Sequence, residues 1–284
     1  MNTCLIVVNT FKKEAIFLKE EIRVFLEEKS ISTKIYTYDG RTASKNASLP
    51  LSFSVDFVIT LGGDGTVLFA SRSCAPLQIP VFAINLGEFG FLAGVDVSIW
   101  KSVLSDFIDG KISGVERSLV LCEVLRDGNT IFSSAGLNDV VISSTASTRL
   151  INLSVAYNHA LLGPFKANGI IVSTATGSTA YSAAAGGPII DPSLDALVLT
   201  PISSFSLSAR PLVFSSKGEI AITVLPSREK VGLSVDGQID CDLQTKDVII
   251  LYVPSYKARL ICSSQEKFYS ALQSKLNWAG GPRA

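Results

Sequence analysis

The spacing of apolar residues predicts the elements of the first part of the chain. Between residues 11 and 26, apolar positions recur every three or four residues in a segment rich in Lys and Glu, which predicts an amphipathic helix. These positions are Phe11, Ala15, Leu18, Ile22, Phe25 and Leu26. Apolar runs of strand length occupy residues 4–8, 34–38, 55–61 and 79–85, and a further helix is predicted over residues 100–108, before the stop signal Asp109-Gly110. Strands that alternate with helices predict an α/β domain with a parallel sheet and flanking helices.

The pattern changes beyond about residue 115. Short β-branched segments separated by turn residues replace the helical spacing, and Asp127-Gly128-Asn129 is a hairpin signal. The predicted strands are residues 118–125, 138–143, 150–157, 169–173, 219–224, 232–235 and 248–253. They predict an all-β, sandwich-like domain. A last helical pattern at residues 264–276 is expected to return to the first domain, so that the predicted domains are residues 1–114 and 115–284, the second carrying the C-terminal helix.

Charge and hydropathy exclude several classes of protein. Lys plus Arg and Asp plus Glu each number 25, so no overall field draws the chain to nucleic acid or to an anionic membrane. The mean hydropathy is +0.38, but every apolar run ends well short of the roughly 18 to 20 residues that a spanning helix needs. We therefore expect no membrane and no nucleic-acid partner.

The numbers of histidine and cysteine residues further limit the kinds of catalytic and metal site that the chain could hold. The chain has one histidine, His159, which argues against Ser-His-Asp or Cys-His catalysis and against a His-rich metal site. Its five cysteines are scattered and show no C-x-x-C spacing, so neither a disulfide framework nor a structural zinc site is predicted, and the cytoplasm fits best. Acid–base chemistry is expected to fall to carboxylates.

Gly62-Gly63-Asp64-Gly65-Thr66 follows an apolar strand and precedes an apolar segment that begins a predicted helix. Such a turn lets backbone N–H groups approach a phosphate, and the helix dipole favours the anion, which makes Gly62, Gly63 and Thr66 candidates for binding a phosphate donor. The carboxylate of Asp64 would repel phosphate unless it served a metal, a ribose hydroxyl or a proton transfer. The alternative is that the glycines serve only the geometry of the turn, since any tight strand–turn–helix needs glycine. No Gly-Lys-Ser/Thr follows, so the turn is not a Walker A loop.

The second Gly-rich stretch, residues 168–181, is expected to meet the first in space, and the overlapping segment 174–187 carries the strongest signal. Thr, Ser, Ala and Gly are so dense here that close approach of the backbone to another object is the natural interpretation. The hydroxyls available to a polar ligand are those of Thr176, Ser178, Thr179, Tyr181 and Ser182. A tight helix–helix contact is the alternative.

Four weaker motifs surround these two. Residues 85–92 carry two glycines and two aromatic residues that could wall a base pocket or only connect a strand to a helix. Asn138-Asp139 offers an adjacent donor and acceptor for ribose or adenine, or a capping turn. Residues 208–212 and 234–238 are weak alone, and a hairpin turn explains the second without any function.

Together these motifs, in this order and at this spacing, resemble the NAD kinase family over most of the chain. The resemblance implies an enzyme, a phosphotransferase that uses ATP, or in some members polyphosphate, to phosphorylate the adenosine 2′-hydroxyl of NAD and form NADP. It implies an α/β domain followed by a β-rich domain and assembly into homodimers or homotetramers. A divalent metal, Mg²⁺ in the first place, would offset the charge of the donor phosphates, and no protein side chain is assigned to hold it.

The resemblance also implies roles for individual residues. The proton acceptor of the family falls on Asp64. The NAD-binding positions are Gly65, Phe89, Asn138, Asp139, Arg149, Lys166, Asn168, Thr179, Ala180, Tyr181, Ser182, Ala183, Ala184 and Gln238. The sequence departs from the family at Asn168, where Asp is usual, at Asp139, where Glu is commoner, and at Ala175, where Pro is usual. Because Asp64 is intact, an active enzyme is expected.

Two other functions compete with this interpretation. A lipid or sugar kinase that shares the Gly-Gly-Asp-Gly turn would explain residues 62–66 but leave residues 176–187 unexplained. A non-catalytic dinucleotide sensor would explain the pocket, but binding alone does not require a carboxylate that faces phosphate.

Overall fold

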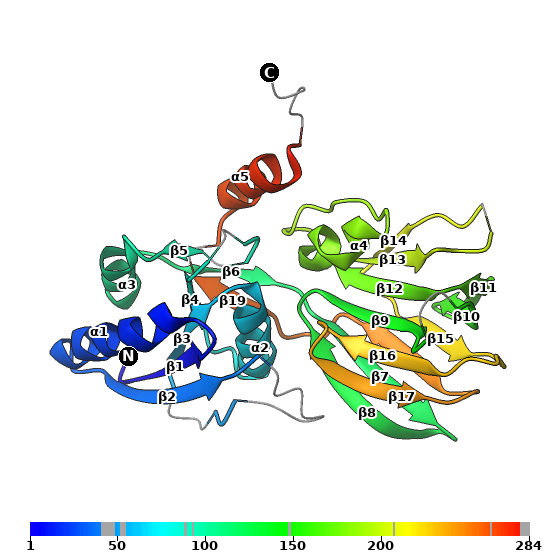
Figure 1. Ribbon diagram of the computed structural model, residues 1–284, viewed down its shortest axis with the longest axis horizontal. Helices are drawn as coiled ribbons and strands as arrows, with labels where there is room; N and C mark the ends of the chain where they lie inside the picture. Colours follow the sequence, from blue (N-terminus) through cyan, green and yellow to red (C-terminus); the bar gives the residue numbers. More distant parts are fainter. Residues whose placement is uncertain are drawn as a thin grey trace. The chain divides into compact units, whose positions relative to one another are not determined.

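The computed structural model describes residues 1–40, 49–51, 55–87, 90–92, 94–146, 149–206, 208–261 and 263–278. They belong to two compact units (Figure 1). Unit 1 comprises Met1–Thr42, Ala47–Arg117 and Lys257–Ala284, and unit 2 comprises Ala43–Asn46 and Ser118–Tyr256. The predicted domains are two continuous segments, 1–114 and 115–284, whereas unit 1 takes up the chain again at Lys257.

Unit 1 is built on a seven-stranded sheet of order β2-β1-β3-β4-β19-β6, with β5 paired to β4. Its strands are β1 (Thr3–Asn9), β2 (Ser32–Tyr38), β3 (Phe57–Gly62), β4 (Val81–Asn85), β5 (Val95–Asp96), β6 (Gly114–Arg117) and β19 (Ala258–Ile261). All pairs are parallel, as predicted, except β19 with β6. The sheet is therefore mixed, because a strand from the far end of the chain inserts beside β4 and leaves β6 at the edge.

The helices of unit 1 are α1 (Lys13–Glu28), α2 (Asp64–Cys74), α3 (Trp100–Ile108) and α5 (Gln265–Leu276), with a 3-10 turn at Ala75–Leu77. Helix α1 buries Ala15, Leu18, Ile22 and Leu26, as its spacing predicts. Phe11 does not belong to this face, because it precedes the helix and is 60% exposed. Helix α3 has the predicted bounds, and Gly110 follows it at φ 73°, the left-handed conformation that glycine adopts without strain.

Unit 2 consists of two six-stranded antiparallel sheets, β11-β10-β15-β18-β7-β8 and β14-β13-β12-β9-β16-β17. The strands of the first sheet are β7 (Val120–Arg126), β8 (Asn129–Gly136), β10 (Ile151–Tyr157), β11 (Ala160–Ala167), β15 (Ile220–Val224) and β18 (Val248–Tyr252). Those of the second are β9 (Asp139–Ser144), β12 (Gly169–Thr174), β13 (Ala196–Ile202), β14 (Leu212–Ser215), β16 (Val231–Val235) and β17 (Ile239–Leu243). The 3-10 turn Thr176–Thr179 and the short helix α4 (Tyr181–Ala184) follow β12.

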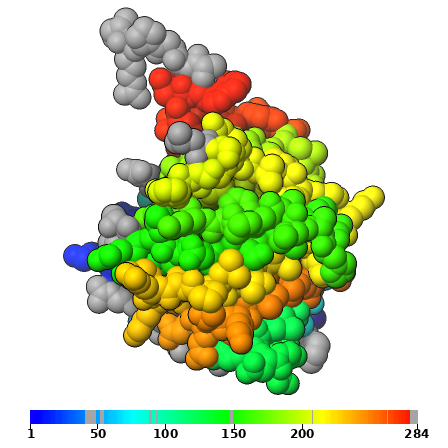
Figure 2. Space-filling model, turned by 90° about the vertical axis from the view of Figure 1, so that its right-hand side faces the viewer, coloured from blue at the N-terminus to red at the C-terminus, as the bar shows by residue number. Residues whose placement is uncertain are grey.

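Alternation of buried residues joins the two sheets into one core. On β10, Ile151, Leu153 and Val155 are fully or almost fully buried, and the residues between them are not. Val140 and Val172 of the other sheet belong to the same cluster, which is the arrangement of a sandwich. In Figure 2 the atoms of this unit are coloured green, yellow and orange.

The predicted hairpin between β7 and β8 is confirmed. Arg126 pairs with Asn129 across a two-residue loop. Asp127 and Gly128 have φ values of 51° and 81°, the positive values that a type I′ turn requires. No helix within the described ranges is long and apolar enough to cross a membrane.

Candidate functional site

The first Gly-rich turn joins β3 to α2 in unit 1. Asp64 is the first residue of α2, and the carbonyl of Gly63 accepts the amides of Thr66 at 2.9 Å and Val67 at 3.3 Å. A helix N-terminus carries partial positive charge, which favours the Asp64 carboxylate there. A side chain at Gly62 would overlap Thr66, whose hydroxyl also accepts from Asn9 Nδ2 at 3.3 Å. Thr66 is 1% exposed, so its hydroxyl stabilises the turn from within.

A second Gly-bearing turn of unit 1, which follows β4, holds the Asp64 carboxylate through residues 90–92. Oδ2 accepts the amide of Phe91 at 3.0 Å and Oδ1 accepts the amide of Leu92 at 3.4 Å. Gly90 passes so close that a Cβ there would overlap this carboxylate. The two turns are also joined at their start, where Leu86 N donates to Gly62 O at 3.0 Å. Gly90 is therefore required by the position of the Asp64 carboxylate.

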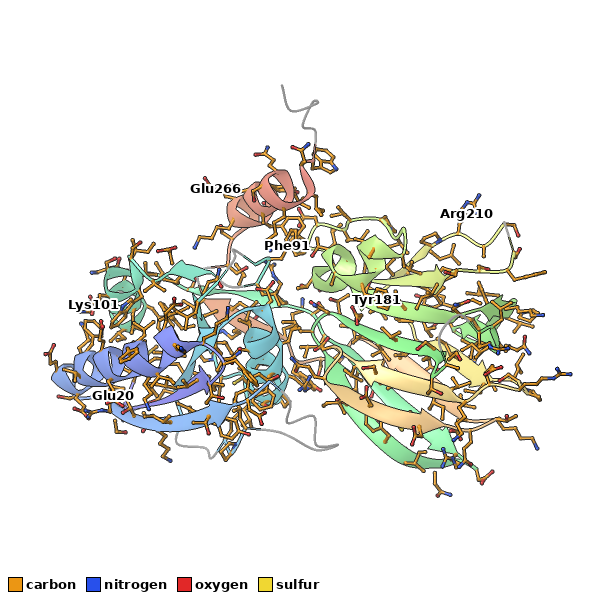
Figure 3. The ribbon with its side chains drawn as sticks, viewed as in Figure 1. Glu20, Phe91, Lys101, Tyr181, Arg210 and Glu266 are labelled. Atoms are coloured by element: carbon orange, nitrogen blue, oxygen red, sulfur yellow. The ribbon has the colours of Figure 1, made fainter. Side chains whose placement is uncertain are left out.

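Helix α5 packs behind this second turn. The ring of Phe91 lies 6.0 Å from that of Phe268, and Lys275 Nζ lies 5.9 Å from the Phe91 ring (Figure 3). Lys267 Nζ donates to the carbonyl of Gly94. The C-terminal helix thus belongs to the support of the turn that holds Asp64. Phe89, predicted to stack on a base, lies outside the described residues.

In unit 2 the chain segment between β8 and β9 meets the end of β12. Thr174 Oγ1 donates to Leu137 O at 2.6 Å, and Thr174 N donates to Asn138 O at 2.9 Å. Gly177 N donates to Thr174 Oγ1 at 3.0 Å, and a Cβ on Gly177 would overlap the carbonyl of Asn138. The close backbone approach predicted for the second Gly-rich stretch is therefore made to residues 137–139.

A third segment of unit 2 reaches the same place. The Asp236 carboxylate, in the turn between β16 and β17, accepts the amides of Leu137 at 2.9 Å, Asn138 at 2.8 Å and Asp139 at 3.1 Å. This residue was not among those predicted, since the hairpin turn accounted for residues 234–238 without any function. The sequence carries no separate signal for it, because Asp-Gly is also the ordinary pair of a two-residue hairpin turn.

Asp139 combines burial with a neighbouring negative charge. It is 5% exposed, and burial, followed by the charge of Asp236, raises its pKa from 3.8 to about 7. A carboxyl in this state exchanges its proton near neutral pH, which is typical of functional sites as well as of strained buried pairs.

The hydroxyl groups after β12 divide into structural and accessible ones. Ser178 Oγ accepts from Ile190 N at 2.9 Å and donates to Ala175 O at 2.7 Å, and Ser182 Oγ lies 2.8 Å from Thr200 Oγ1. Ser178 and Ser182 are fully buried, whereas Tyr181 is 47% exposed (Figure 3). Of the predicted positions here, Thr179, Ala180 and Ala183 are half-buried and Ala184 is exposed.

The remaining predicted positions have separate surroundings. Arg149 is exposed, 3.9 Å from Glu229, while Asn168 is half-buried and makes backbone hydrogen bonds to Ile202 and Ser144. Gln238 lies in the same turn as Asp236, and its backbone amide donates to Val235 O. The Nζ of Lys166 lies 5.3 Å from the Phe205 ring, and a cavity of about 310 Å³ is lined by Lys166, Leu162, Pro164, Ser204, Arg210 and Leu212 among others. Lys166 and Arg210 give this cavity the positive charge that suits phosphate.

Comparison with known proteins identifies the family. Residues 49–112 match the model of the ATP-NAD kinase N-terminal domain, and residues 137–263 match that of the ATP-NAD kinase C-terminal domain. An NAD kinase of Treponema denticola is 45% identical over 281 residues, which cover 99% of this chain and 98% of that protein. The chain belongs to the NAD kinase family. It is therefore an enzyme, a phosphotransferase, and the lipid-kinase, sugar-kinase and sensor interpretations are not favoured.

Solved structures of the family share the fold. Yeast NADH kinase, crystallised with NADH, superposes with a TM-score of 0.87 at 24% identity, covering 100% of this chain and 89% of that one. An NAD kinase from Archaeoglobus fulgidus, crystallised with ATP, gives a TM-score of 0.77 at 22% identity, covering 99% and 100%. The predicted α/β domain, β-sandwich and C-terminal helix are thus confirmed.

Replacing Gly90 by Ala tests the contact between the two turns of unit 1. Because the new methyl group would occupy the place of the Asp64 carboxylate, we expect Gly90→Ala to lower kcat by about tenfold or more. Gly87→Ala is the control, since a Cβ there meets only the flexible end of Lys12, at 3.2 Å. Steady-state kinetics that gave equal kcat for the two variants would contradict the close approach at Gly90.

The raised pKa of Asp139 predicts a pH-dependent gain in stability for Asp139→Asn. The native pKa exceeds the unfolded one, so the wild-type protein loses stability as the pH rises toward 7, while the amide does not ionise. At pH 8 the variant should be more stable by about 1–3 kcal/mol, and the difference should shrink toward pH 4. Thermal unfolding across this range measures it, and a difference independent of pH would refute the raised pKa.

Proposed function

We propose that this chain transfers the terminal phosphate of ATP to the adenosine 2′-hydroxyl of NAD and so forms NADP. The observation that carries the proposal is Asp64, a carboxylate placed at the N-terminus of α2 directly after two glycines and held by the amides of Phe91 and Leu92. Family membership supplies the substrates, and the anchored carboxylate supplies the chemistry. A turn that only binds phosphate would not need the Asp64 carboxylate.

Asp64 acts as the general base in this proposal. Its carboxylate takes the proton of the 2′-hydroxyl as that oxygen bonds to the terminal phosphorus of ATP, and the bond to the bridging oxygen breaks to release ADP. The Phe91 and Leu92 amides each use one carboxylate oxygen, and an oxygen can accept more than one hydrogen bond. Asp64 therefore stays able to accept the ribose hydroxyl while its side chain is fixed.

The phosphate donor binds beside Asp64. Gly62, Gly63 and Thr66 shape this place, with the Thr66 hydroxyl acting through the turn rather than on the donor. Among the described residues, no group of three or more His, Cys, Asp or Glu side chains could hold a metal ion. In our proposal Mg²⁺ therefore arrives on the phosphates of ATP, whose charge it offsets.

The proposed NAD contacts are assigned residue by residue. Asn138 and Asp139 supply the adjacent donor and acceptor for the adenosine end, Gly65 is exposed beside Asp64, and Tyr181 is the exposed aromatic residue after β12. Lys166 suits the pyrophosphate, since it lines the positively charged cavity. The other proposed contacts are Phe89, Arg149, Asn168, Thr179, Ala180, Ser182, Ala183, Ala184 and Gln238. Ser182 would act by holding the turn, because its hydroxyl is buried against Thr200.

We also propose that the chain works as a homodimer or homotetramer in the cytoplasm. The outermost strands β11 and β14 of the two sheets, with the segment before β14, expose Leu161 and Phe205 at 71% each and Val213 at 51%. Outer strands that carry exposed apolar groups are typical of an interface. Cys4, Cys74 and Cys122 are buried free thiols, as expected of a reducing compartment.

Light scattering after size exclusion tests the assembly. We expect a mass of two or four times 30.3 kDa for the wild type and a lower mass for the double variant Leu161→Ser, Phe205→Ser. Phe17→Ser is the control, since Phe17 is 74% exposed on α1 of unit 1. A wild-type mass of 30.3 kDa would contradict the proposal.

The base is tested with Asp64→Asn. Incubation with NAD, ATP and magnesium should yield NADP, detected with an NADP-specific dehydrogenase. The amide keeps the size and one acceptor oxygen, so NAD affinity should stay within about tenfold while kcat falls by about 10² or more. Asp109→Asn, an exposed carboxylate paired with Lys111, should leave kcat unchanged. Near wild-type turnover in Asp64→Asn would refute the general base.

A further inference from the structure

Asp236 makes contacts that the hairpin between β16 and β17 does not need. Its Oδ2 accepts the amide of Leu137, and its Oδ1 accepts the amides of both Asn138 and Asp139, at 2.8 to 3.1 Å. In return, Asp236 N donates to Asp139 O at 2.9 Å. Four hydrogen bonds thus join one turn residue to three consecutive residues about 100 positions earlier in the chain.

These hydrogen bonds cannot be replaced by water without a change of structure. Leu137 is fully buried, and Asp139 and Asp236 are 5% and 9% exposed. A buried N–H group without an acceptor is strongly unfavourable, and here three in succession converge on one carboxylate. If the carboxylate were removed, residues 137–139 would have to move toward solvent to satisfy their amides.

The other side of this segment is held as well. The hydroxyl and amide of Thr174 bond to the carbonyls of Leu137 and Asn138, and Gly177 packs against Asn138. Asp236 therefore holds the N–H groups of the segment while the end of β12 holds its carbonyl groups. Both must be in place for Asn138 and Asp139 to have one backbone position.

We propose that Asp236 is a positioning residue for NAD: it fixes the backbone from which Asn138 and Asp139 reach the dinucleotide, without touching the dinucleotide itself. The inference rests on the proposed function in assigning those two residues to NAD. Phosphate transfer at Asp64 does not depend on Asp236 once NAD is bound. Loss of Asp236 should therefore weaken NAD binding more than it slows turnover.

Two substitutions suit the backbone at this position. Asp236 has φ 52°, which Asn and Gly adopt with little strain. Asp236→Asn keeps one acceptor oxygen but presents an NH₂ group to an amide, and Asp236→Gly removes all three hydrogen bonds. A graded effect, with Gly stronger than Asn, is expected because the number of satisfied amides falls in that order.

Asp247→Asn is the matched control in the same unit. The Asp247 carboxylate is 1% exposed, accepts Gln244 N at 2.7 Å and forms two hydrogen bonds with Arg126, at 2.8 and 2.9 Å. It resembles Asp236 in burial and in capping a backbone amide, but it bonds to the segment before β18 rather than to residues 137–139. Loss of the Asp247 carboxylate should lower the melting temperature of unit 2 without loosening residues 137–139.

The first measurement is hydrogen exchange in the full chain. In the Asp236 variants the amides of residues 137–139 should exchange at least about tenfold faster, while that of Val172 in β12 should be unchanged. The Asp247 variant should leave residues 137–139 protected. Equal protection of these amides in wild type and Asp236→Gly would overturn the positioning role.

The second measurement separates positioning from loss of stability. We expect Asp236→Gly to raise KM for NAD about tenfold, and Asp236→Asn about threefold to fivefold, with KM for ATP and kcat within about twofold. Asp247→Asn should leave KM for NAD within about twofold. An unchanged KM for NAD in the Asp236 variants, or an equal rise in the Asp247 variant, would overturn the inference. A wild-type protein that formed no NADP would overturn the proposed function instead, and hydrogen exchange would still decide whether Asp236 holds the segment.

Discussion

Hydrogen bonds from backbone amides to a carboxylate hold the functional turn in each unit. In unit 1 the amides of Phe91 and Leu92 bond to Asp64, and in unit 2 those of residues 137–139 bond to Asp236. A charged acceptor makes such bonds stronger than neutral ones, and partial burial makes their loss costly. Turns that would otherwise be mobile loops are thereby fixed relative to the strands that carry them.

Close packing at two glycine residues also fixes these turns. Gly90 gives room to the Asp64 carboxylate, and Gly177 gives room to the Asn138 carbonyl. Gly90 and Asp64 lie in the segments after β4 and β3, while Gly177 lies after β12 and Asn138 just before β9, so each contact joins the ends of two strands of one sheet. The hydroxyls of Thr66, Ser178 and Ser182 are used inside these turns, and the chemistry is left to carboxylates, amides and the exposed Tyr181.

Local patterns predicted the local features well. The bounds of α3, the Asp127-Gly128 turn and the buried face of α1 follow from residues close in sequence. The pairing of β19 with β4 and β6 did not, because it joins residues more than 140 positions apart and no local pattern encodes it. Asp64 was predicted as a site residue because its signal, the Gly residues beside it, is local. The partners of Asp236 lie about 100 positions earlier in the chain and were found only in the structure. Ser182, predicted from its hydroxyl, is buried against Thr200, which its spacing could not reveal.

The proposed reaction requires that the adenosine 2′-hydroxyl receive the phosphate. Phosphorus NMR of the products that the purified protein forms from NAD, ATP and magnesium tests this most directly, because a 2′-phosphomonoester is resolved from the pyrophosphate of the dinucleotide and from ADP. We expect a 2′-phosphate signal that grows in equal amount with ADP and is lost in Asp64→Asn. ATP consumption without a 2′-phosphate signal, or a phosphate on another hydroxyl, would contradict it.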